Sequence, residues 1–411
     1  MHIVTANEMY EMDRFAMEEG GLDGRILMEN AGRAITEKII PLLANESQVL
    51  ILVGAGNNGG DGFVIGRTLR NQGYGVNLLQ LVSDEKVRGD ARYHKQVFQN
   101  YGGLVHVDAK GEKIECFLEQ ADVVIDAIFG IGIKDKLRPP FDRIIPMINN
   151  KSAKVISVDI PSGVPADEGL TFQTGVEADY TFIVEQPKMS AFLQHTADFY
   201  GKWEPVSIGL PPIGHGKHTI RRTWQQADVQ KTLPSRDRFS HKGNHGRGLV
   251  IGGSYEMIGS VAMSAKAALR SGAGLLTVAT AKEVIPSVSS HCAEATYLSL
   301  PSKDGRIAGP VSIDFSMYDG IAIGMGMGRD SNAKAFTRQV IQMSNQQLLI
   351  DADGIHHIHD DLTVLEQREH PTVLTPHLGE MSLLTGLPVA QILLNPFAVT
   401  KEFATRYHIW Y

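Results

Sequence analysis

The stretch "LVGAGNNGGDGFVIGRTLRNQGYGVNLLQLV" (residues 52–82) decides how the first half of this sequence is interpreted. Its glycines at positions 54, 56 and 59 have the spacing G-x-G-x-x-G and lie between an apolar strand and a helical run. That arrangement is typical of loops that bind the diphosphate of a dinucleotide at a helix N-terminus. Asp61 argues against this function, because a carboxylate in the first helical turn would repel a diphosphate. A glycine-rich turn with Asp61 as a helix cap is the structural alternative.

Apolar, strand-like runs alternate with helix-like segments through the first half of the chain. The runs are 48–55, 76–82, 104–107, 122–130, 154–163 and 180–186. Such alternation indicates βαβ units, which form a mostly parallel sheet with helices on both faces. We therefore expect an α/β domain.

Three strand-like segments end in polar loops, namely "NNGGDG" (57–62), "DAIFGIG" (126–132) and "DIPSG" (159–163). The C-terminal ends of parallel strands meet at one edge of the sheet, where ligands bind. We expect Asn58, Asp126, Asp159 and Ser162 to converge there. Carboxylate, amide and hydroxyl oxygens suit a cation, or a cation beside an acid–base residue. The alternative is that each aspartate only caps the helix that follows it.

The second half repeats the alternation after a break at "IGLPPIGHGKHTIRR" (208–222). The break is rich in Pro, Gly and basic residues and lacks apolar periodicity, which is typical of a linker. Strand-to-loop transitions then follow at 248–254, 275–280, 320–328, 347–354 and 372–380. We expect two independent α/β domains.

The composition argues against several classes of partner. The net charge of −7 disfavours nucleic acid or an anionic membrane as the main partner. The chain has only two cysteines, far apart at positions 116 and 292, so we expect neither a disulfide framework nor a cysteine metal cluster. The N-terminal "MHIVTANEMYEMDRFAMEEGG" carries acids where a signal peptide needs an apolar segment, and no apolar run is long enough to cross a bilayer. We therefore expect a cytoplasmic protein.

The first half resembles the epimerase domain of the NAD(P)H-hydrate repair enzymes. The resemblance covers about residues 1–215 and is carried by "ILMENAGRAI" (26–35), "VGAGNNGGDGFVIGR" (53–67), "VIDAIFGIGI" (124–133) and "VISVDIPSGV" (155–164). It implies a Rossmann-like, three-layer, parallel-sheet domain that interconverts the R and S forms of NAD(P)H hydrated at C6 of the nicotinamide ring. The dinucleotide is then a small-molecule substrate, NAD(P)HX, and not a hydride-transfer cofactor.

The resemblance also implies roles for individual residues. Asp159 is the implied catalytic base, and a potassium ion (K⁺) is implied at Asn58, Asp126 and Ser162. The implied substrate contacts are Asn57, Asn58, Gly59, Gly60, Asp61, Gly130, Ile131, Gly132, Ile133, Lys134, Asp135, Lys136 and Asp159. The residue types suit the chemistry, because C6 is a hemiaminal carbon whose change of configuration needs proton transfer and a transient cationic ring.

From about residue 225 the sequence resembles the dehydratase domain of the same bifunctional enzymes, which makes 216–224 the linker. The matching stretches are "RDRFSHKGNHGRGLVIGGS" (236–254), "GSVAMSAKAALRSGAGLLTVAT" (259–280), "IAIGMGMGR" (321–329), "LLIDADG" (348–354) and "VLTPHLGEMSLLTG" (373–386). The resemblance implies a ribokinase-like α/β domain over 225–411 that uses ADP or ATP, with Mg²⁺ as a further candidate cofactor, to dehydrate S-NAD(P)HX. The implied substrate contacts are Gly259, Gly326 and His377.

The second domain departs from the family's pattern at its end. In the family a later lysine–glycine strand and a "GGSGD" or "GGTGD" loop supply the nucleotide-phosphate amides and the catalytic aspartate. This sequence reaches "FATRYHIWY" (403–411) without a G-[ST]-G-D, so charge stabilisation and a base are both absent. We therefore expect a C-terminally truncated, inactive dehydratase domain with exposed apolar surface and an unpaired sheet edge.

Two other functions stay open. A small-molecule kinase of the ribokinase type shares the fold of the second domain, but the missing G-[ST]-G-D loop counts against it. A non-catalytic dinucleotide-binding protein is disfavoured by the complete trio Asn58, Asp126 and Asp159. We also expect a homo-oligomer, with the amphipathic segment "MYEMDRFAMEEGG" (9–21) packed on its own domain or on a partner subunit.

Overall fold

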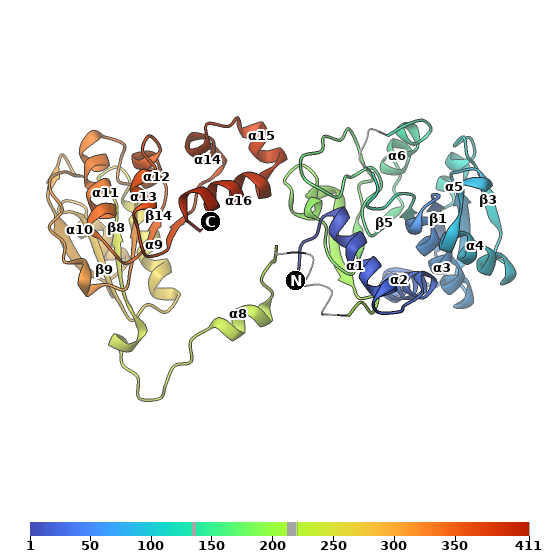
Figure 1. The fold of residues 1–411 in the computed structure, drawn as a ribbon, viewed down its shortest axis with the longest axis horizontal. Helices are drawn as coiled ribbons and strands as arrows, with labels where there is room; N and C mark the ends of the chain where they lie inside the picture. Colours follow the sequence, from blue (N-terminus) through green and yellow to red (C-terminus); the bar gives the residue numbers. More distant parts are fainter. Residues whose placement is uncertain (134–136, 212–218, 220, 411) are drawn as a thin grey trace. The chain divides into compact units, whose positions relative to one another are not determined.

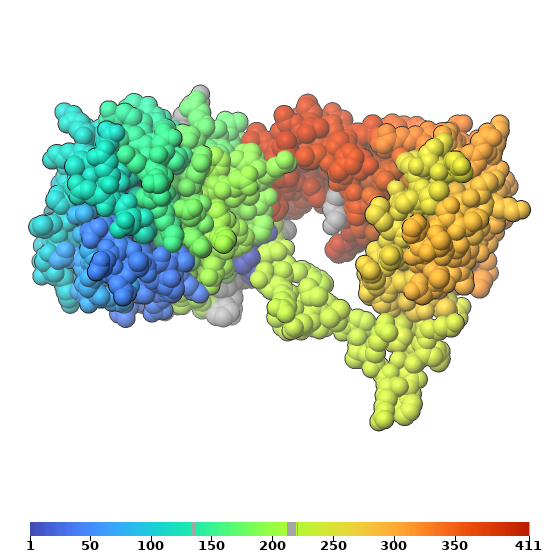
Figure 2. Space-filling model, turned by 180° about the vertical axis from the view of Figure 1, so that it is seen from behind, coloured from blue at the N-terminus to red at the C-terminus, as the bar shows by residue number. Residues whose placement is uncertain are grey.

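The chain forms two compact units, Met1–Leu233 and Pro234–Tyr411. The computed structural model describes residues 1–133, 137–211, 219 and 221–410. Figure 1 labels many of the elements of both units, and Figure 2 shows the first unit in blue to green and the second in yellow-green to red. None of the helices in these described ranges is long and apolar enough to cross a bilayer.

The boundary between the units lies after the expected linker at 216–224. Residues 216–218 and 220 fall outside the described residues. Beyond them, Arg221 accepts a backbone hydrogen bond from Ile3 (3.0 Å), and Thr223 donates one to Met1 (2.9 Å). Thr219 also donates from its hydroxyl to the carbonyl of Ile3 (2.9 Å). The second part of the expected linker therefore belongs to the first unit, because it pairs with the N-terminus.

The first unit is built on a seven-stranded parallel sheet in the order β3-β2-β1-β4-β5-β6-β7. Its strands are β1 (Gln48–Val53), β2 (Gly75–Gln80), β3 (Val105–Val107), β4 (Val123–Ala127), β5 (Lys154–Val158), β6 (Tyr180–Val184) and β7 (Lys202–Val206). After its first residue β1 is buried throughout, which is typical of a parallel strand covered on both faces. The predicted α/β fold is confirmed here.

Alternate residues of β1 pack against helices on opposite faces of the sheet. Ile51 and Val53 belong to one apolar cluster with α2 (Gly24–Ile39), α3 (Asn57–Asn71) and α4 (Gly89–Asn100). Leu50 and Leu52 belong to a second cluster with α5 (Ile114–Glu119) and α6 (Phe141–Asn149). The unit therefore has three layers, helices–sheet–helices (Figure 1).

Helix α1 (Ala6–Glu18) packs on its own unit, so its apolar face is buried without a partner subunit. Met9, Met12 and Ala16 form an apolar cluster with Leu27 of α2 and with residues 208 and 210. A capping box of Thr5 and Glu8 begins the helix. This helix covers the C-terminal edge of the sheet beside the loop of residues 130–133.

The second unit contains a six-stranded parallel sheet in the order β10-β9-β8-β13-β14-β15. The strands are β8 (Arg247–Ile251), β9 (Leu275–Ala281), β10 (Thr296–Leu300), β13 (Gly320–Ile323), β14 (Gln347–Ile350) and β15 (Thr372–Leu374), with a small hairpin of β11 (Ser302–Lys303) and β12 (Arg306–Ile307). The helices are α8 (Gln226–Thr232, in the first unit), α9 (Ile258–Arg270), α10 (Ile285–His291), α11 (Ser331–Met343), α12 (Asp353–Ile358), α13 (Thr363–Glu366), α14 (Leu378–Thr385), α15 (Val389–Leu394) and α16 (Pro396–Tyr407).

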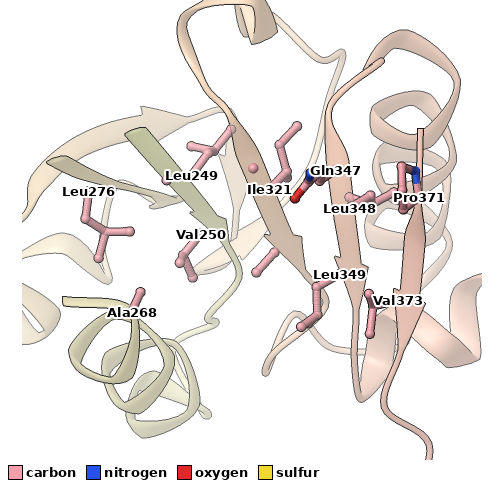
Figure 3. A pocket seen from close by; sticks show the side chains of 13 residues that line it. Leu249, Val250, Ala268, Leu276, Ile321, Gln347, Leu348, Leu349, Pro371 and Val373 are labelled. Atoms are coloured by element: carbon pink, nitrogen blue, oxygen red, sulfur yellow. The ribbon is translucent and has the colours of Figure 1, made fainter. Parts of the chain in front are cut away.

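One face of this second sheet carries an apolar cavity of about 330 Å³ (Figure 3). Ala322, Leu349 and Val373 lie side by side on β13, β14 and β15 and are only half-buried, whereas their neighbours along each strand are buried. The cavity therefore leaves apolar side chains of this face partly exposed. At the edge of the sheet, Trp410 pairs with β15 through hydrogen bonds to Thr372 (2.8 Å) and from Leu374 (3.0 Å).

Candidate active site

The candidate site of the first unit lies at the C-terminal edge of its sheet, between β1 and β4. Here the strand order reverses, because the chain runs outward from β1 to β3 and then returns to β4 on the other side of β1. Ligands of open parallel sheets bind at this kind of switch point. A pocket of about 550 Å³ opens there, and polar groups from four segments line it, among them Asn57, Asn58, Asp61, Asp159 and Lys188. The predicted convergence of these loops is thus present in the structure.

The glycine loop allows two backbones to approach closely. A Cβ atom on Gly54 would lie 2.0 Å from the carbonyl oxygen of Ile128, in the loop after β4. A Cβ atom on Gly59 would lie 2.4 Å from the carbonyl oxygen of Gly54. Only glycine fits both positions. Helix α3 begins at Asn57, which lines the pocket. Its N-cap residue, Gly56, offers no side chain to the first turn of the helix.

Asp61 does not have the position that the sequence suggested. Helix α3 begins at Asn57, so Asp61 is its fifth residue and lies beyond the first turn. It caps nothing and is 7 % exposed, and burial together with the nearby Asp159 and Asp13 raises its pKa well above the usual aspartate value. The capping interpretation was therefore wrong, and the raised pKa of Asp61 weakens the argument that this residue repels a diphosphate.

Asn58, Asp126 and Ser162 form one buried cluster with the backbone of Phe129. The Ser162 hydroxyl donates to Asp126 Oδ1 (2.5 Å), and Asp126 Oδ2 accepts from the Ser162 amide (2.8 Å) and the Ser157 hydroxyl (2.8 Å). The Phe129 amide donates to the Ser162 hydroxyl (2.8 Å), and Asn58 Nδ2 donates to the Phe129 carbonyl (2.5 Å). Burial raises the pKa of Asp126, although these hydrogen bonds oppose the effect. The three predicted ion ligands are thus brought together.

An oxygen-ligated cation fits this cluster. Asn58 Oδ1 is buried and has no hydrogen-bond partner among the described residues, which is rare for a buried polar atom. The other polar groups of this cluster are the Ser162 hydroxyl, the Asp126 carboxylate and the Phe129 carbonyl. Their oxygens are of the kind that hard cations prefer as ligands. The residues therefore suit the implied ion.

Asp159 is held in a left-handed backbone conformation (φ 67°) immediately after β5. Its Oδ1 accepts hydrogen bonds from the Val184 amide (2.9 Å) and from the ammonium group of Lys188. Lys188 is fully buried, and its Nζ also donates to the Val184 carbonyl (3.1 Å). Among the described residues Oδ2 of Asp159 has no hydrogen-bond partner, and Asp159 lines the pocket. One carboxylate oxygen is therefore anchored, and the other is available to a ligand.

The alternative that each aspartate only caps a helix is not supported. Asp159 contacts β6 and Lys188, and Asp126 binds the loops of residues 128 and 162. Neither residue begins a helix, because the next helix after Asp126 is α6. These two side chains hold loops together at the edge of the sheet.

The implied substrate loop after β4 reaches the pocket. Residues 130–133 line it, with Gly132 close to the Tyr10 hydroxyl, since a Cβ atom on Gly132 would lie 3.5 Å from that oxygen. Gly59 and Gly60 pack behind the pocket lining, where an added Cβ on Gly60 would meet the sulfur of Met28 at 2.3 Å. The expected contacts Lys134, Asp135 and Lys136 lie outside the described residues.

Sequence reasoning missed several pocket residues, among them the ionisable Tyr10, Asp13, Asp90 and Lys188. Tyr10 and Asp13 belong to α1, which was expected only to pack. Lys188 follows β6, the strand beside β5, so the rule that parallel strands end at one edge would have placed it near Asp159. Asp13 had a weaker signal, a carboxylate next to the apolar positions Met9 and Met12 of an amphipathic helix.

The three residues implied for the second unit lie on different elements. Gly326 has a left-handed conformation (φ 68°). A Cβ atom added to it would lie 2.8 Å from the carbonyl oxygen of Met257 and 3.0 Å from Cβ of Ser260. The loop of Gly326 therefore contacts the segment that contains Gly259. His377 instead caps α14, where Nδ1 accepts from the amides of Gly379 (3.0 Å) and Glu380 (3.3 Å). The side chain of His377 is 71 % exposed. None of the described residues that line the apolar cavity of Figure 3 has a titratable side chain.

Comparison with known proteins covers both units. Residues 24–190 match the family described as YjeF-related protein N-terminus, and residues 248–408 match the family described as NAD(P)H-hydrate dehydratase. A bifunctional NAD(P)H-hydrate repair enzyme from Moorella thermoacetica is 33 % identical over 98 % of this chain and 78 % of its own length. The enzyme of the same description from Synechocystis is 32 % identical over 93 % of this chain and 72 % of its own length. A crystal structure of the Bacillus subtilis ADP/ATP-dependent NAD(P)H-hydrate dehydratase with ATP/Mg²⁺ is 29 % identical, with a TM-score of 0.37 over 45 % of this chain and 64 % of that one.

Proposed function

The chain belongs to the bifunctional NAD(P)H-hydrate repair enzymes, and from that premise we propose that its first unit interconverts the R and S forms of NAD(P)HX. One observation carries the proposal: Asn58, Asp61, Asp159 and the loop of residues 130–133 line a single pocket. Its volume of about 550 Å³ is in the usual range of small-molecule sites.

Asp159 is the base in this proposal. Its Oδ1 is held by Val184 and Lys188, which leaves Oδ2 to act on the substrate. The hydroxyl of C6 takes up a proton and leaves as water, and the electron pair of N1 stabilises the cationic ring that remains. Water then adds to the other face of the ring, and Asp159 receives the proton that the water loses. The step balances, because one water leaves and one returns, and Asp159 gives back to solvent a proton equal to the one that the leaving hydroxyl takes up.

The N-terminus of α3 supports binding of the anionic part of the dinucleotide. Gly56 leaves the first amides of the helix without a side-chain cap, and the residues at the start of the helix line the pocket. Free amides at a helix N-terminus attract phosphate groups. The raised pKa of Asp61 favours its neutral form, which does not oppose such binding.

Asn58, Asp126 and Ser162 would hold the potassium ion, which supplies a fixed positive charge beside the pocket. The unpartnered Oδ1 of Asn58 supports this assignment. We expect potassium chloride to raise the melting temperature of the protein more than a salt of a bulky organic cation does, because an ion bound only to the native state stabilises it. Asn58→Leu should remove that difference. An equal response to both salts in the unaltered protein would contradict the potassium assignment.

The epimerase proposal is tested by following the R and S forms of NADHX by chromatography with the purified chain and potassium. We expect equilibration faster than in buffer, and a loss of about 100-fold or more in Asp159→Asn, which is the usual contribution of a general base. Glu204→Gln is a matched control, since Glu204 pairs with Lys38 on the surface of β7. An Asp159→Asn variant as active as the unaltered chain would exclude Asp159 as the base.

The dehydratase half leads to a separate expectation. The proposed cofactors are ADP or ATP with Mg²⁺, and the proposed substrate contacts are Gly259, Gly326 and His377. Because the 411 residues contain no G-[ST]-G-D, we expect them to form no NADH from S-NADHX, with or without nucleotide. Nucleotide-dependent appearance of the NADH absorbance would show that another segment supplies the missing acid.

A further inference from the structure

Helix α1 forms one wall of the epimerase pocket with the face that carries Met9, Tyr10, Asp13 and Met17. The helix is held firmly at its start. Thr5 and Glu8 form a capping box, the Ala6 amide donates to Asp167 (2.7 Å), and Arg221 pairs with Glu8. A side chain on this face is therefore placed by a rigid element, as a catalytic group requires.

Asp13 belongs to a cluster of ionisable groups around the ammonium of Lys188. It is partly buried in the pocket wall, and Asp61 and Asp159 line the same pocket from α3 and from the end of β5. The ionisable groups that influence Asp13 or are influenced by it are Lys188, Asp159, Glu185, Asp61 and Tyr10. Three of the pocket carboxyls lie close to one buried lysine, so the cluster is electrically neutral when one of the three is ionised and two are protonated.

Resting on the epimerisation proposed above, we propose that Asp13 is a second catalytic residue, the acid that protonates the departing C6 hydroxyl while Asp159 serves the incoming water. The proton passes from the Asp13 carboxyl to the hydroxyl oxygen, the C6–O bond breaks, and its electron pair leaves with water. Water then forms the new C6–O bond and gives its proton to Asp159. Proton transfer from Asp159 back to Asp13 restores the starting state.

Asp13 suits this role better than its neighbours. Burial, opposed by Lys188, raises the pKa of Asp13 to about 6, close to the operating pH, where a general acid is most effective. Asp61 is more deeply buried, and this burial raises its pKa well above the usual value. The pKa of Tyr10 is raised above its ordinary value near 10 by burial and by Asp13 and Asp159, which makes it a weaker acid still. Asp13 lies outside the residues 24–190 that match the YjeF-related family.

The test measures epimerisation of R- and S-NADHX against pH in the full chain, for the unaltered protein and for Asp13→Asn, Asp13→Glu and Asp61→Asn. Glu18→Gln is the matched control, because Glu18 is on the same helix but exposed. We expect Asp13→Asn to lower kcat about 100-fold with KM within about threefold, and to abolish the fall in rate at high pH. Asp13→Glu should restore part of kcat together with that fall. Glu18→Gln should behave as the unaltered protein does.

Three results would overturn the proposal. They are an unchanged pH profile in Asp13→Asn, a change in KM alone, and loss of the high-pH limb in Asp61→Asn but not in Asp13→Asn. A second measurement uses only the unaltered protein and does not depend on catalytic turnover. The carboxyl carbon of Asp13, followed by NMR in the unaltered protein, should still report the protonated form near pH 5, and an ordinary aspartate titration would exclude an acid role.

The two measurements separate the failure of this inference from the failure of the proposed function. If the unaltered chain does not epimerise NADHX, the proposed function fails and the catalytic role of Asp13 fails with it, whatever the carboxyl titration shows. If the chain epimerises NADHX and Asp13→Asn keeps its rate and profile, only the role of Asp13 is refuted.

Discussion

Lys188 is fully buried, and its charge is balanced by Asp159, which is 9 % exposed. Lys188→Met would leave the Asp159 carboxylate buried without its cation. We expect the free energy of unfolding to fall by about 3 kcal/mol, since breaking a buried ion pair is costlier than removing both charges. Urea denaturation measures this loss. The double variant Lys188→Met/Asp159→Asn should recover most of it, and a single variant as stable as the parent would contradict the ion-pair assignment.

Asp13 should make stability depend on pH. Its pKa is raised to about 6, so between about pH 4 and pH 6 the folded chain keeps a proton that the unfolded chain has released. Stability from this group is complete below that window and is lost as pH rises through it. Asp13→Asn should therefore be roughly 2 kcal/mol more stable than the parent at pH 8, after both are aligned at pH 4. Melting curves at the two pH values test this, and Glu18→Gln should show no such difference.

At the scale of residues, sequence reasoning found the groups that stand in motifs at strand ends. Asn58, Asp126, Asp159 and Ser162 each follow an apolar strand, and parallel strands bring such positions together whatever the rest of the fold does. Asp13 and Lys188 lie in segments without a glycine loop. Their place in the pocket depends on how α1 and the loop after β6 pack, which local sequence does not specify.

At the scale of elements, α2 and α3 cross at a glycine. A Cβ atom on Gly32 would lie 2.5 Å from Cβ of Val64 and 3.1 Å from the carbonyl of Asp61. Gly32→Ala should push the helices apart, lower the free energy of unfolding by about 1–3 kcal/mol and slow epimerisation by moving Asp61. Val64→Ala in the same chain should relieve part of the clash. A double-mutant cycle without coupling between these two sites would show that an alanine at position 32 does not clash with Val64.

The strands that sequence reasoning identified are those with long apolar runs, and the strands it missed are short or at an edge. Strand β7 contains Pro205, which cannot donate to a ladder and is tolerated because β7 ends the sheet. The sequence KWEPV therefore has no strand signal of its own. Residues 57–62, which were expected to form a polar loop, instead form the first turns of helix α3.

At the scale of the whole molecule, the exposed face of the second sheet should affect solubility. Leu349 is half-buried on the face that carries the cavity, and Ile350 is fully buried on the other face of β14. Leu349→Gln should reduce binding of a hydrophobic dye and aggregation, at a cost below about 1 kcal/mol. Ile350→Gln should cost about 3 kcal/mol or more, because it buries an unpaired amide. Equal effects of the two substitutions would show that the Leu349 face is covered in solution.

The sequence by itself determined the fold class, the two α/β units and the polar loops of the first site, because apolar periodicity, glycine spacing and strand-end residues are local signals. Only the tertiary structure decided the pKa shifts of these residues and which groups surround them. The pKa of Asp61 is raised because this residue is buried next to Asp159 and Asp13. Lys188 and Val184 bind Oδ1 of Asp159, and Oδ2 has no hydrogen-bond partner in the described part of the chain. Burial and the distances between distant segments set these properties, and both come from packing.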